Sequence, residues 1–145
     1  MKKFGRTLLI LVGIGLVLFL LIQLIPYGRN HTNPAVVAEP TWDNPATRDL
    51  VKRACFDCHS NETVWPWYSN VAPISWVVYR DVEEGRNRMN FSEWSSNFHP
   101  NVNELVGIVQ AGEMPPFQYL LMHPNAKLSA ADKQALISGL QKSIP

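Results

Sequence analysis

The chain has 145 residues, with 13 Lys and Arg against 12 Asp and Glu, so its formal net charge is +1. This length accommodates one membrane segment and one small domain. Lys2, Lys3 and Arg6 precede the first apolar run. The rest of the chain contains the other 10 of the 13 basic residues and all 12 acidic ones, so its charge is about −2. So small a charge creates no field that would steer nucleic acid or an acidic partner, and we expect no nucleic-acid partner.

Residues 7–25 form an apolar run in which only Thr7 and Gln23 are polar. A helix needs roughly 20 such residues to cross the hydrocarbon core of a bilayer. The three basic residues lie before the run and Arg29 alone follows it closely, a bias that keeps the N-terminus in the cytoplasm. We therefore predict that residues 1–26 are a single-pass anchor in a bacterial inner membrane and that the rest of the chain lies in the periplasm.

A cleaved signal peptide is the alternative interpretation of this run. Its apolar region would be shorter, and a small-x-small cleavage site would follow soon after it. The nearest candidate site, Val36-Val37-Ala38, lies well beyond the apolar run and is followed closely by Pro40. An uncleaved anchor is favoured, and both interpretations place the domain outside the cytoplasm.

Residues 27–41 have little periodicity and contain two prolines, which is typical of a linker. The domain then occupies residues 42–145. Asp43 or Asn44 can cap a helix that begins at Pro45, because proline is tolerated in a first helical turn. Its inward positions at helical spacing are Val51, Ala54, Cys55 and Cys58. The pattern predicts a helix that ends near His59 and buries both thiols.

Three more helices follow from the same periodicity. One begins at Pro73 and stops near Gly85, a second runs from Val102 to about Gly112, and a third begins after a capping-box-like Ser129. Their expected inward residues are Ile74, Val77, Val78 and Val82 in the first, Val102, Leu105, Val106 and Val109 in the second, and Ala135, Leu136 and Leu140 in the third. Since no alternating strand pattern occurs, the sequence predicts an all-α domain behind one transmembrane helix.

The most informative motif is C-x-x-C-H, at Cys55, Cys58 and His59. It is the pattern of a c-type haem attachment site, in which two thiols three positions apart bond the haem vinyl groups and the histidine binds the iron. A redox dithiol would need a β-α-β context, and a zinc site would need a second ligand pair; the sequence indicates neither. Covalent haem attachment in bacteria takes place outside the cytoplasm, so the export segment agrees with one covalently bound haem c. A chance match of five residues is the remaining alternative.

A second axial ligand is needed on the other face of the iron. Met114 is the prediction because it lies just past a helix end in G-E-M-P-P, where prolines restrict the backbone. Class I cytochromes c supply a methionine from such a loop. Met89 and Met122 are expected to fill the core. The histidines are expected elsewhere: His31 in the linker, and His99 and His123 in turns, with ligation as their second interpretation.

The chain resembles the bacterial haem-binding domain family. The resemblance rests on C-x-x-C-H-S-N-x-T-x-W-P-W-Y, A-P-I-S-W, N-F-S-E-W and G-E-M-P-P with Y-x-x-x-H-P-x-A-x-L-S, found at residues 55–68, 72–76, 90–94 and 112–129. It implies one c-type haem on a class I cytochrome-c-like helical fold, commonly behind a membrane anchor. Carried over by position, it implies thioether bonds at Cys55 and Cys58, a proximal ligand at His59 and a distal ligand at Met114.

Three functions are compatible with these patterns. The favoured hypothesis is a membrane-tethered electron carrier with six-coordinate iron. On this hypothesis the protein is not an enzyme. A haem enzyme or a peroxide or gas sensor would need a displaceable distal ligand. In a structural haem subunit of a membrane complex, the haem would need neither a displaceable ligand nor a role in electron transfer.

Overall fold

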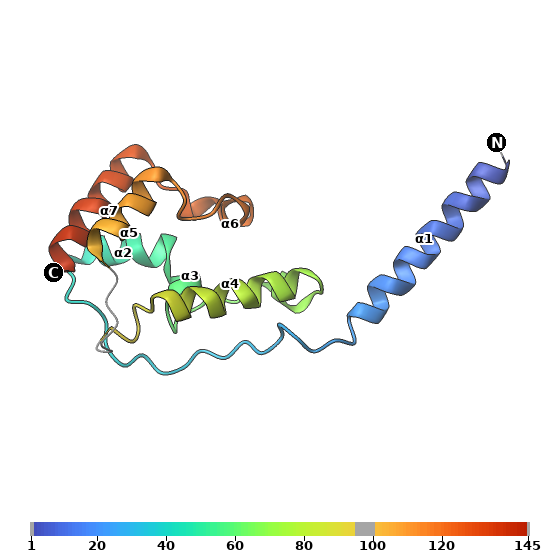
Figure 1. The fold of residues 1–145 in the computed structure, drawn as a ribbon, viewed down its shortest axis with the longest axis horizontal. Helices are drawn as coiled ribbons and strands as arrows, with labels where there is room; N and C mark the ends of the chain where they lie inside the picture. The colour runs from blue at the N-terminus through green and yellow to red at the C-terminus, as the bar shows by residue number, and fades with distance from the viewer. Residues whose placement is uncertain (1, 95–100, 145) are drawn as a thin grey trace. The chain divides into compact units, whose positions relative to one another are not determined.

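The computed structural model describes residues 2–94 and 101–144, and in these ranges the chain forms helices and no strand. An isolated bridge between Ala38 and Glu93 is the one β-type pairing in those ranges. The prediction of an all-α protein with an apolar N-terminal helix is confirmed, whereas its cytochrome-c-like class stays a prediction. Figure 1 draws the helices in colours that run from blue at the N-terminus to red at the C-terminus. The chain divides into two compact units, one made of residues up to 32 with 65–81 and the other of residues 33–64 with those from 82 onward.

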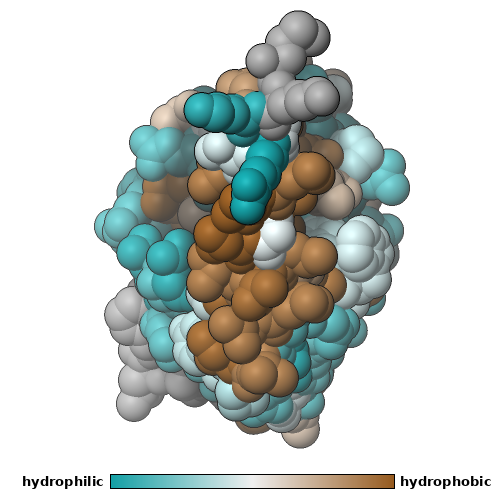
Figure 2. Space-filling model, turned by 90° about the vertical axis from the view of Figure 1, so that its right-hand side faces the viewer, coloured by the Kyte–Doolittle hydropathy of each residue, from teal (hydrophilic) through white to brown (hydrophobic). Residues whose placement is uncertain are grey.

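The first unit contains helix α1 (Lys2–Ile22) and the 3-10 helix η1 (Trp67–Asn70). Residues Lys3–Ile22 are long and apolar enough to cross a membrane, and none of this stretch is buried inside the protein. Figure 2, seen from the side on which α1 is drawn in Figure 1, shows a continuous apolar surface in brown. A helix with apolar side chains on all sides needs an apolar environment, which agrees with a membrane span.

The second unit begins its helices with α2 (Pro45–Ala54), as predicted. The Asn44 side chain caps it by accepting a hydrogen bond of 3.0 Å from the Thr47 N–H. The expected continuation to His59 is wrong, because the backbone leaves the helical region at Cys55 (φ −128°) and a short helix α3 (Phe56–His59) follows. The change of direction turns Phe56 into the core at 1% exposure and leaves both cysteines half-buried.

The core of the second unit lies where α2, α5 (Val102–Ala111) and α7 (Ala130–Ser143) pack together. Gly112 ends α5 in the left-handed region (φ 74°), and Ser129 with Asp132 forms a complete capping box at the start of α7, both as predicted. Leu136 and Leu140 are buried as expected, whereas Ala135 is exposed. The sequence patterns missed α6 (Phe117–Met122) and the 3-10 helices η1 and η2 (Pro124–Ala126), which are too short for a periodic pattern.

Helix α4 (Ile74–Arg88) differs most from expectation. It does not stop at Gly85 but continues for another three residues. Ile74 and Val77 are 50% and 46% exposed, so this part of the predicted apolar stripe is not buried. Val82 is buried as predicted, and Ser75, which was not expected to face inward, is buried too. Met89, just beyond the helix, joins the core as expected, but Met122 is 57% exposed and does not.

Residues 37–39 are held to the rest of the second unit. Val37 and Ala38 donate hydrogen bonds to the Ser92 carbonyl, Trp94 donates to the Ala38 carbonyl, and Arg48 binds both carboxylate oxygens of Glu39 (2.6 and 2.8 Å). The bidentate Arg48 contact holds the pKa of Glu39 below its ordinary value of 4.5. The proposed division into anchor, linker and domain stays a prediction.

The pKa of Glu39 predicts how stability depends on pH. A folded-state pKa below the unfolded value means that the unfolded chain binds more protons in the acid range, so this contribution is present above about pH 4.5 and is lost as pH falls. We expect Glu39→Gln to remove about 1 kcal/mol at neutral pH and to flatten the acid limb of the unfolding free energy. Urea unfolding at a series of pH values measures both. Glu104→Gln, at an exposed position of α5, is the control; equal acid limbs in Glu39→Gln and the wild type would contradict the prediction.

Candidate functional site

The motif residues Cys55, Cys58 and His59 are brought together by a single turn of chain. Cys55 is the residue before α3, and its carbonyl accepts hydrogen bonds from the N–H groups of Cys58 (3.2 Å) and His59 (2.8 Å). Neither cysteine forms a disulfide, and both are half-buried. One short helix therefore presents two sulfur atoms and one imidazole from neighbouring positions.

The His59 imidazole is held in one orientation and one tautomer. Its Nδ1 lies 3.2 Å from the Met89 carbonyl oxygen, which can only accept, so Nδ1 carries the proton and donates. Burial lowers the pKa of His59 below its ordinary value, so the ring is neutral at neutral pH. The Nε2 atom therefore keeps its lone pair, and a backbone acceptor at Nδ1 is the usual support of a metal-binding histidine.

The Cys55 thiol does not have the properties of a redox-active cysteine. Burial, with a smaller contribution from the neighbouring Cys58, raises the pKa of this thiol to about 12. Reactive dithiols and zinc ligands depend on a lowered thiol pKa, because the thiolate is the reacting form. Among the described residues, no group of three or more His, Cys, Asp and Glu side chains is placed to hold a metal ion. The raised pKa of Cys55 is therefore unlike that of a reactive dithiol.

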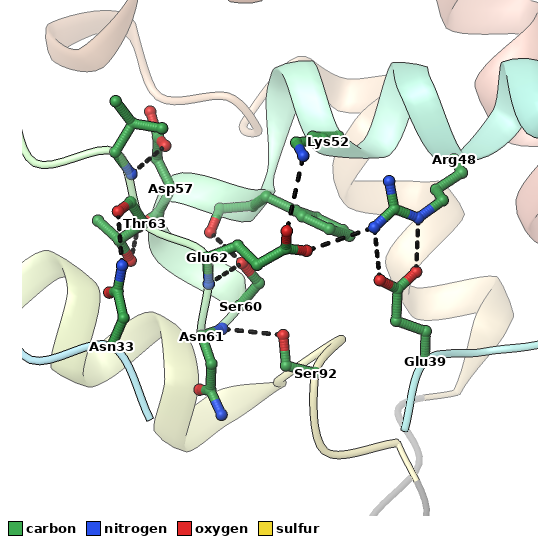
Figure 3. A network of polar contacts seen from close by, with 12 residues as sticks. Asn33, Glu39, Arg48, Lys52, Asp57, Ser60, Asn61, Glu62, Thr63 and Ser92 are labelled. Carbon is green, nitrogen blue, oxygen red and sulfur yellow. Dashed lines mark hydrogen bonds and ion pairs between the residues drawn. The ribbon is translucent and has the colours of Figure 1, made fainter. Parts of the chain in front are cut away.

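The segment that follows the C-x-x-C-H motif is hydrogen-bonded to residues 90–92, the first three residues of the N-F-S-E-W motif. The Phe91 N–H donates to the His59 carbonyl (2.8 Å), and the Asn61 N–H donates to the Ser92 hydroxyl (2.9 Å). Figure 3 shows the Asn61–Ser92 hydrogen bond beside the Ser60 hydroxyl, which accepts a hydrogen bond from the Glu62 N–H. The two separated motifs thus form one hydrogen-bonded unit around the carboxyl end of α3.

Asp57, between the two cysteines, links α3 to the segment that carries Met114. Its Oδ2 accepts a 2.7 Å hydrogen bond from the Tyr119 hydroxyl, and its Oδ1 accepts one of 3.0 Å from the Val64 N–H. The Tyr119 ring stacks on His123, whose Nδ1 lies 3.9 Å from Asp57 Oδ2. Met114 is half-buried and precedes α6 by two prolines, so Tyr119 ties the helix after Met114 to the C-x-x-C-H turn.

The other ligand candidates lie elsewhere. His31 belongs to the first unit, where its ring stacks on Trp65 (4.5 Å between centroids) and its Nε2 lies 3.1 Å from the Ser69 carbonyl oxygen. His99 lies outside the described residues. His123 is engaged with Tyr119 and Asp57, as described above. The choice of Met114 as distal ligand therefore stays a prediction.

Comparison with known families gives one match, to the haem-binding domain family, over residues 17–142. The chain belongs to the haem-binding domain family. No curated protein and no solved structure matches it. The match makes this a haem-binding protein, and the donor set found here fits the group: a neutral, oriented imidazole stands next to two cysteines that form no disulfide.

Gly85 is a residue of this haem-binding domain whose role the sequence did not indicate. A Cβ atom at this position of α4 would lie 2.9 Å from the Cys58 carbonyl carbon and 3.0 Å from the Cys58 Cβ. Real Cβ atoms do not approach so closely, so only glycine lets α4 pack directly against the C-x-x-C-H turn. A glycine inside a helix resembles a stop signal in the sequence, and no local pattern distinguishes the two roles.

Arg86, one residue further, is also structural in this domain. Its guanidinium donates to the Ser60 carbonyl, the Thr63 hydroxyl and the Asn33 side chain, each at 2.9 Å. These three contacts use the fork of the guanidinium to hold the loop after His59. Arg86 therefore stabilises the loop that follows the motif, and its guanidinium is used in hydrogen bonds to the protein rather than pointing into solvent.

Proposed function

We propose that this haem-binding protein is a membrane-anchored c-type cytochrome that carries electrons on one covalently attached haem. The observation that supports this most is the hydrogen bond from His59 Nδ1 to the Met89 carbonyl, inside a C-x-x-C-H motif. With the proton at Nδ1, the neutral ring keeps a lone pair at Nε2, the atom through which a histidine binds haem iron. In this proposal Cys55 and Cys58 form the thioether bonds, His59 is the proximal ligand and Met114 is the distal ligand.

The bound haem supplies one-electron chemistry, and the protein supplies ligation, orientation and burial. The Met89 carbonyl keeps the His59 ring from rotating and holds the proton at Nδ1. The Tyr119–Asp57 hydrogen bond keeps α6, and with it the Met114 loop, next to α3. Carrying an electron needs no substrate pocket and no general acid or base, so the proposal makes this protein a carrier rather than an enzyme.

The proposed location follows from α1. Lys3 and Arg6 lie at its amino end, and the apolar stretch ends before Gln23. By the positive-inside rule, the domain then faces the periplasm and the helix lies in the cytoplasmic membrane. Confinement at the membrane surface would bring the domain to a redox partner without a strong charge field.

Two spectra of the purified protein test the proposal. A pyridine haemochrome spectrum reports the vinyl groups, and we expect the form with both vinyls saturated and a haem that stays on the chain under denaturing conditions. Magnetic spectroscopy of the oxidised protein reports the axial ligands, and we expect low-spin iron with nitrogen and sulfur ligation. Haem that is extracted by acidic organic solvent, or five-coordinate high-spin iron, would overturn the proposal.

Met114→Ala is the matching variant. We expect it to lose the sulfur-to-iron band of the oxidised protein and to lower the reduction potential by on the order of 0.1 V, within the roughly 0.8 V that axial ligation spans. Optical spectra and a redox titration measure the two effects. Met122→Ala is the control, since that side chain is 57% exposed and has no proposed role. A Met114→Ala protein with the wild-type band would show that another residue is the ligand.

A further inference from the structure

A segment far along the chain is fastened to the end of the apolar helix α1. Gln23 directly follows α1, and its side chain makes two hydrogen bonds with the backbone of Ala72: Nε2 donates to the Ala72 carbonyl and Oε1 accepts from the Ala72 N–H, both at 2.9 Å. This pairing is the one a neighbouring β-strand would make. It holds Ala72, and the first turn of α4, at the carboxyl end of α1.

A second contact in the same unit reinforces the attachment. Gly28 adopts φ 78°, and a Cβ atom there would lie 2.8 Å from the Ser75 carbonyl carbon. Tyr27 also contacts Tyr79, with 5.4 Å between the ring centroids. The chain just after α1 therefore packs along α4 from Ser75 to Tyr79.

The residues around this attachment expose apolar side chains. Trp67 in η1 is 75% exposed, and Ile74 and Val77, one turn apart on the same face of α4, are 50% and 46% exposed. Scattered exposed apolar residues are ordinary, but these three flank the point where Ala72 meets Gln23. Leu24 and Ile25, the apolar residues that follow Gln23, have exposed side chains as well.

The position of Gln23 indicates where these exposed apolar side chains lie relative to a bilayer. At 1.5 Å per residue, the 20 residues of Lys3–Ile22 span about 30 Å, the thickness of the hydrocarbon core. Gln23 then lies at the boundary between hydrocarbon and headgroups, and Ala72 lies there with it. This boundary is where tryptophan and tyrosine side chains concentrate in membrane proteins.

The charges on α4 agree with that placement. Arg80 and Asp81 follow Val77 on α4, and Arg80 lies about 9 Å further along the axis than Ile74. The apolar residues thus occupy the turn nearest to Ala72, and the charged residues begin farther from it. This order matches a helix that leaves a membrane surface.

We propose that Trp67, Ile74 and Val77 are a second membrane contact, inserted into the headgroup layer of the bilayer that α1 spans. The inference rests on the membrane anchor of the proposed function. Gln23 is the residue that couples the two contacts, because its side chain holds the segment at the depth where α1 ends.

Photo-crosslinking of the full chain in lipid nanodiscs tests this contact. Benzoylphenylalanine is placed at one site at a time: Val77, Leu16 inside α1, or Gln134, which is exposed on α7. The discs contain phosphatidylcholine and phosphatidylglycerol, and mass spectrometry detects chains that have gained one phospholipid. We expect the lipid adduct at Val77 to approach that at Leu16 and to exceed that at Gln134 about tenfold.

The three sites separate the possible failures. An adduct at Leu16 with only the Gln134 level at Val77 would overturn the second contact and leave the anchor intact. The Gln134 level at Leu16 would overturn the anchor itself, and the second contact with it. A crosslink from Val77 to a second protein chain in place of lipid would also overturn the proposal. None of these results depends on how the haem is attached.

Gln23→Ala extends the test to the coupling. Removing the two hydrogen bonds with Ala72 should lower the lipid adduct at Val77 about threefold or more, while the adduct at Leu16 stays unchanged. Gln118→Ala, at an exposed position of α6, is the matched control and should leave both adducts unchanged. An unchanged Val77 adduct in Gln23→Ala would contradict the role assigned to Gln23.

Discussion

Replacing Cys55 and Cys58 together by alanine is expected to abolish covalent haem attachment. The chain has two cysteines, both in the C-x-x-C-H turn, so no other thiol can substitute for them. The double variant should show no haem stain on a denaturing gel, a loss of at least about a hundredfold. The single variants should keep one bond each, and their pyridine haemochrome spectra should show one unsaturated vinyl group.

The double variant should also accumulate less folded protein. A domain of about 100 residues has a small core, and a bound prosthetic group stabilises the folded state that binds it. Circular dichroism of the purified variant separates loss of haem from loss of helix. Covalent haem retained in the double variant would show that the attachment lies elsewhere in the chain and would end the c-type proposal.

The second large effect is expected at Gly85. In Gly85→Ala the new methyl group would meet the Cys58 carbonyl group and Cβ within 3.0 Å. Backbone atoms cannot rotate away as the end of a long side chain can, so α3 and α4 must separate. Overpacking of this kind typically costs 1–3 kcal/mol, and with backbone on one side we expect about 3 kcal/mol. Urea unfolding measures the free energy, and the yield of haem-loaded protein reports the effect on the motif.

Gly107→Ala is the matched control for Gly85→Ala. Gly107 also lies inside a helix, α5, but a Cβ atom there would have no neighbour within 4 Å. Alanine should therefore stabilise the protein by about 0.5–1 kcal/mol through its higher helix propensity. The same chemical change thus has opposite signs in two helices. Equal effects at both positions would mean that the α3–α4 contact does not constrain the protein.

Several helix ends could be predicted because their signals are local. Asn44 with Pro45 starts α2, Gly112 ends α5, and Ser129 with Asp132 starts α7, each through groups within a few residues of one another. The short helix α6 has no comparable signal. Its position is set by the Tyr119–Asp57 hydrogen bond, which joins residues 62 positions apart.

Periodicity misjudged α4 for a related reason. An apolar residue at helical spacing predicts a buried face, but it does not say whether protein or lipid covers that face. Ile74 and Val77 fit the spacing of a core helix and are nevertheless exposed. The buried side of α4 carries Ser75, Val82 and Gly85, and the glycine lets the backbone of α4 approach that of Cys58 closely.

By itself the sequence determined the residue types and the spacing of the haem motif, since Cys55, Cys58 and His59 lie within five positions and their chemistry depends on that spacing. The tertiary structure decided how the motif is held. The carbonyl that fixes the His59 tautomer comes from Met89, 30 positions away, and the backbone packing against Cys58 comes from Gly85. Contacts between distant residues are set by how helices pack, and no local pattern of residues records that packing.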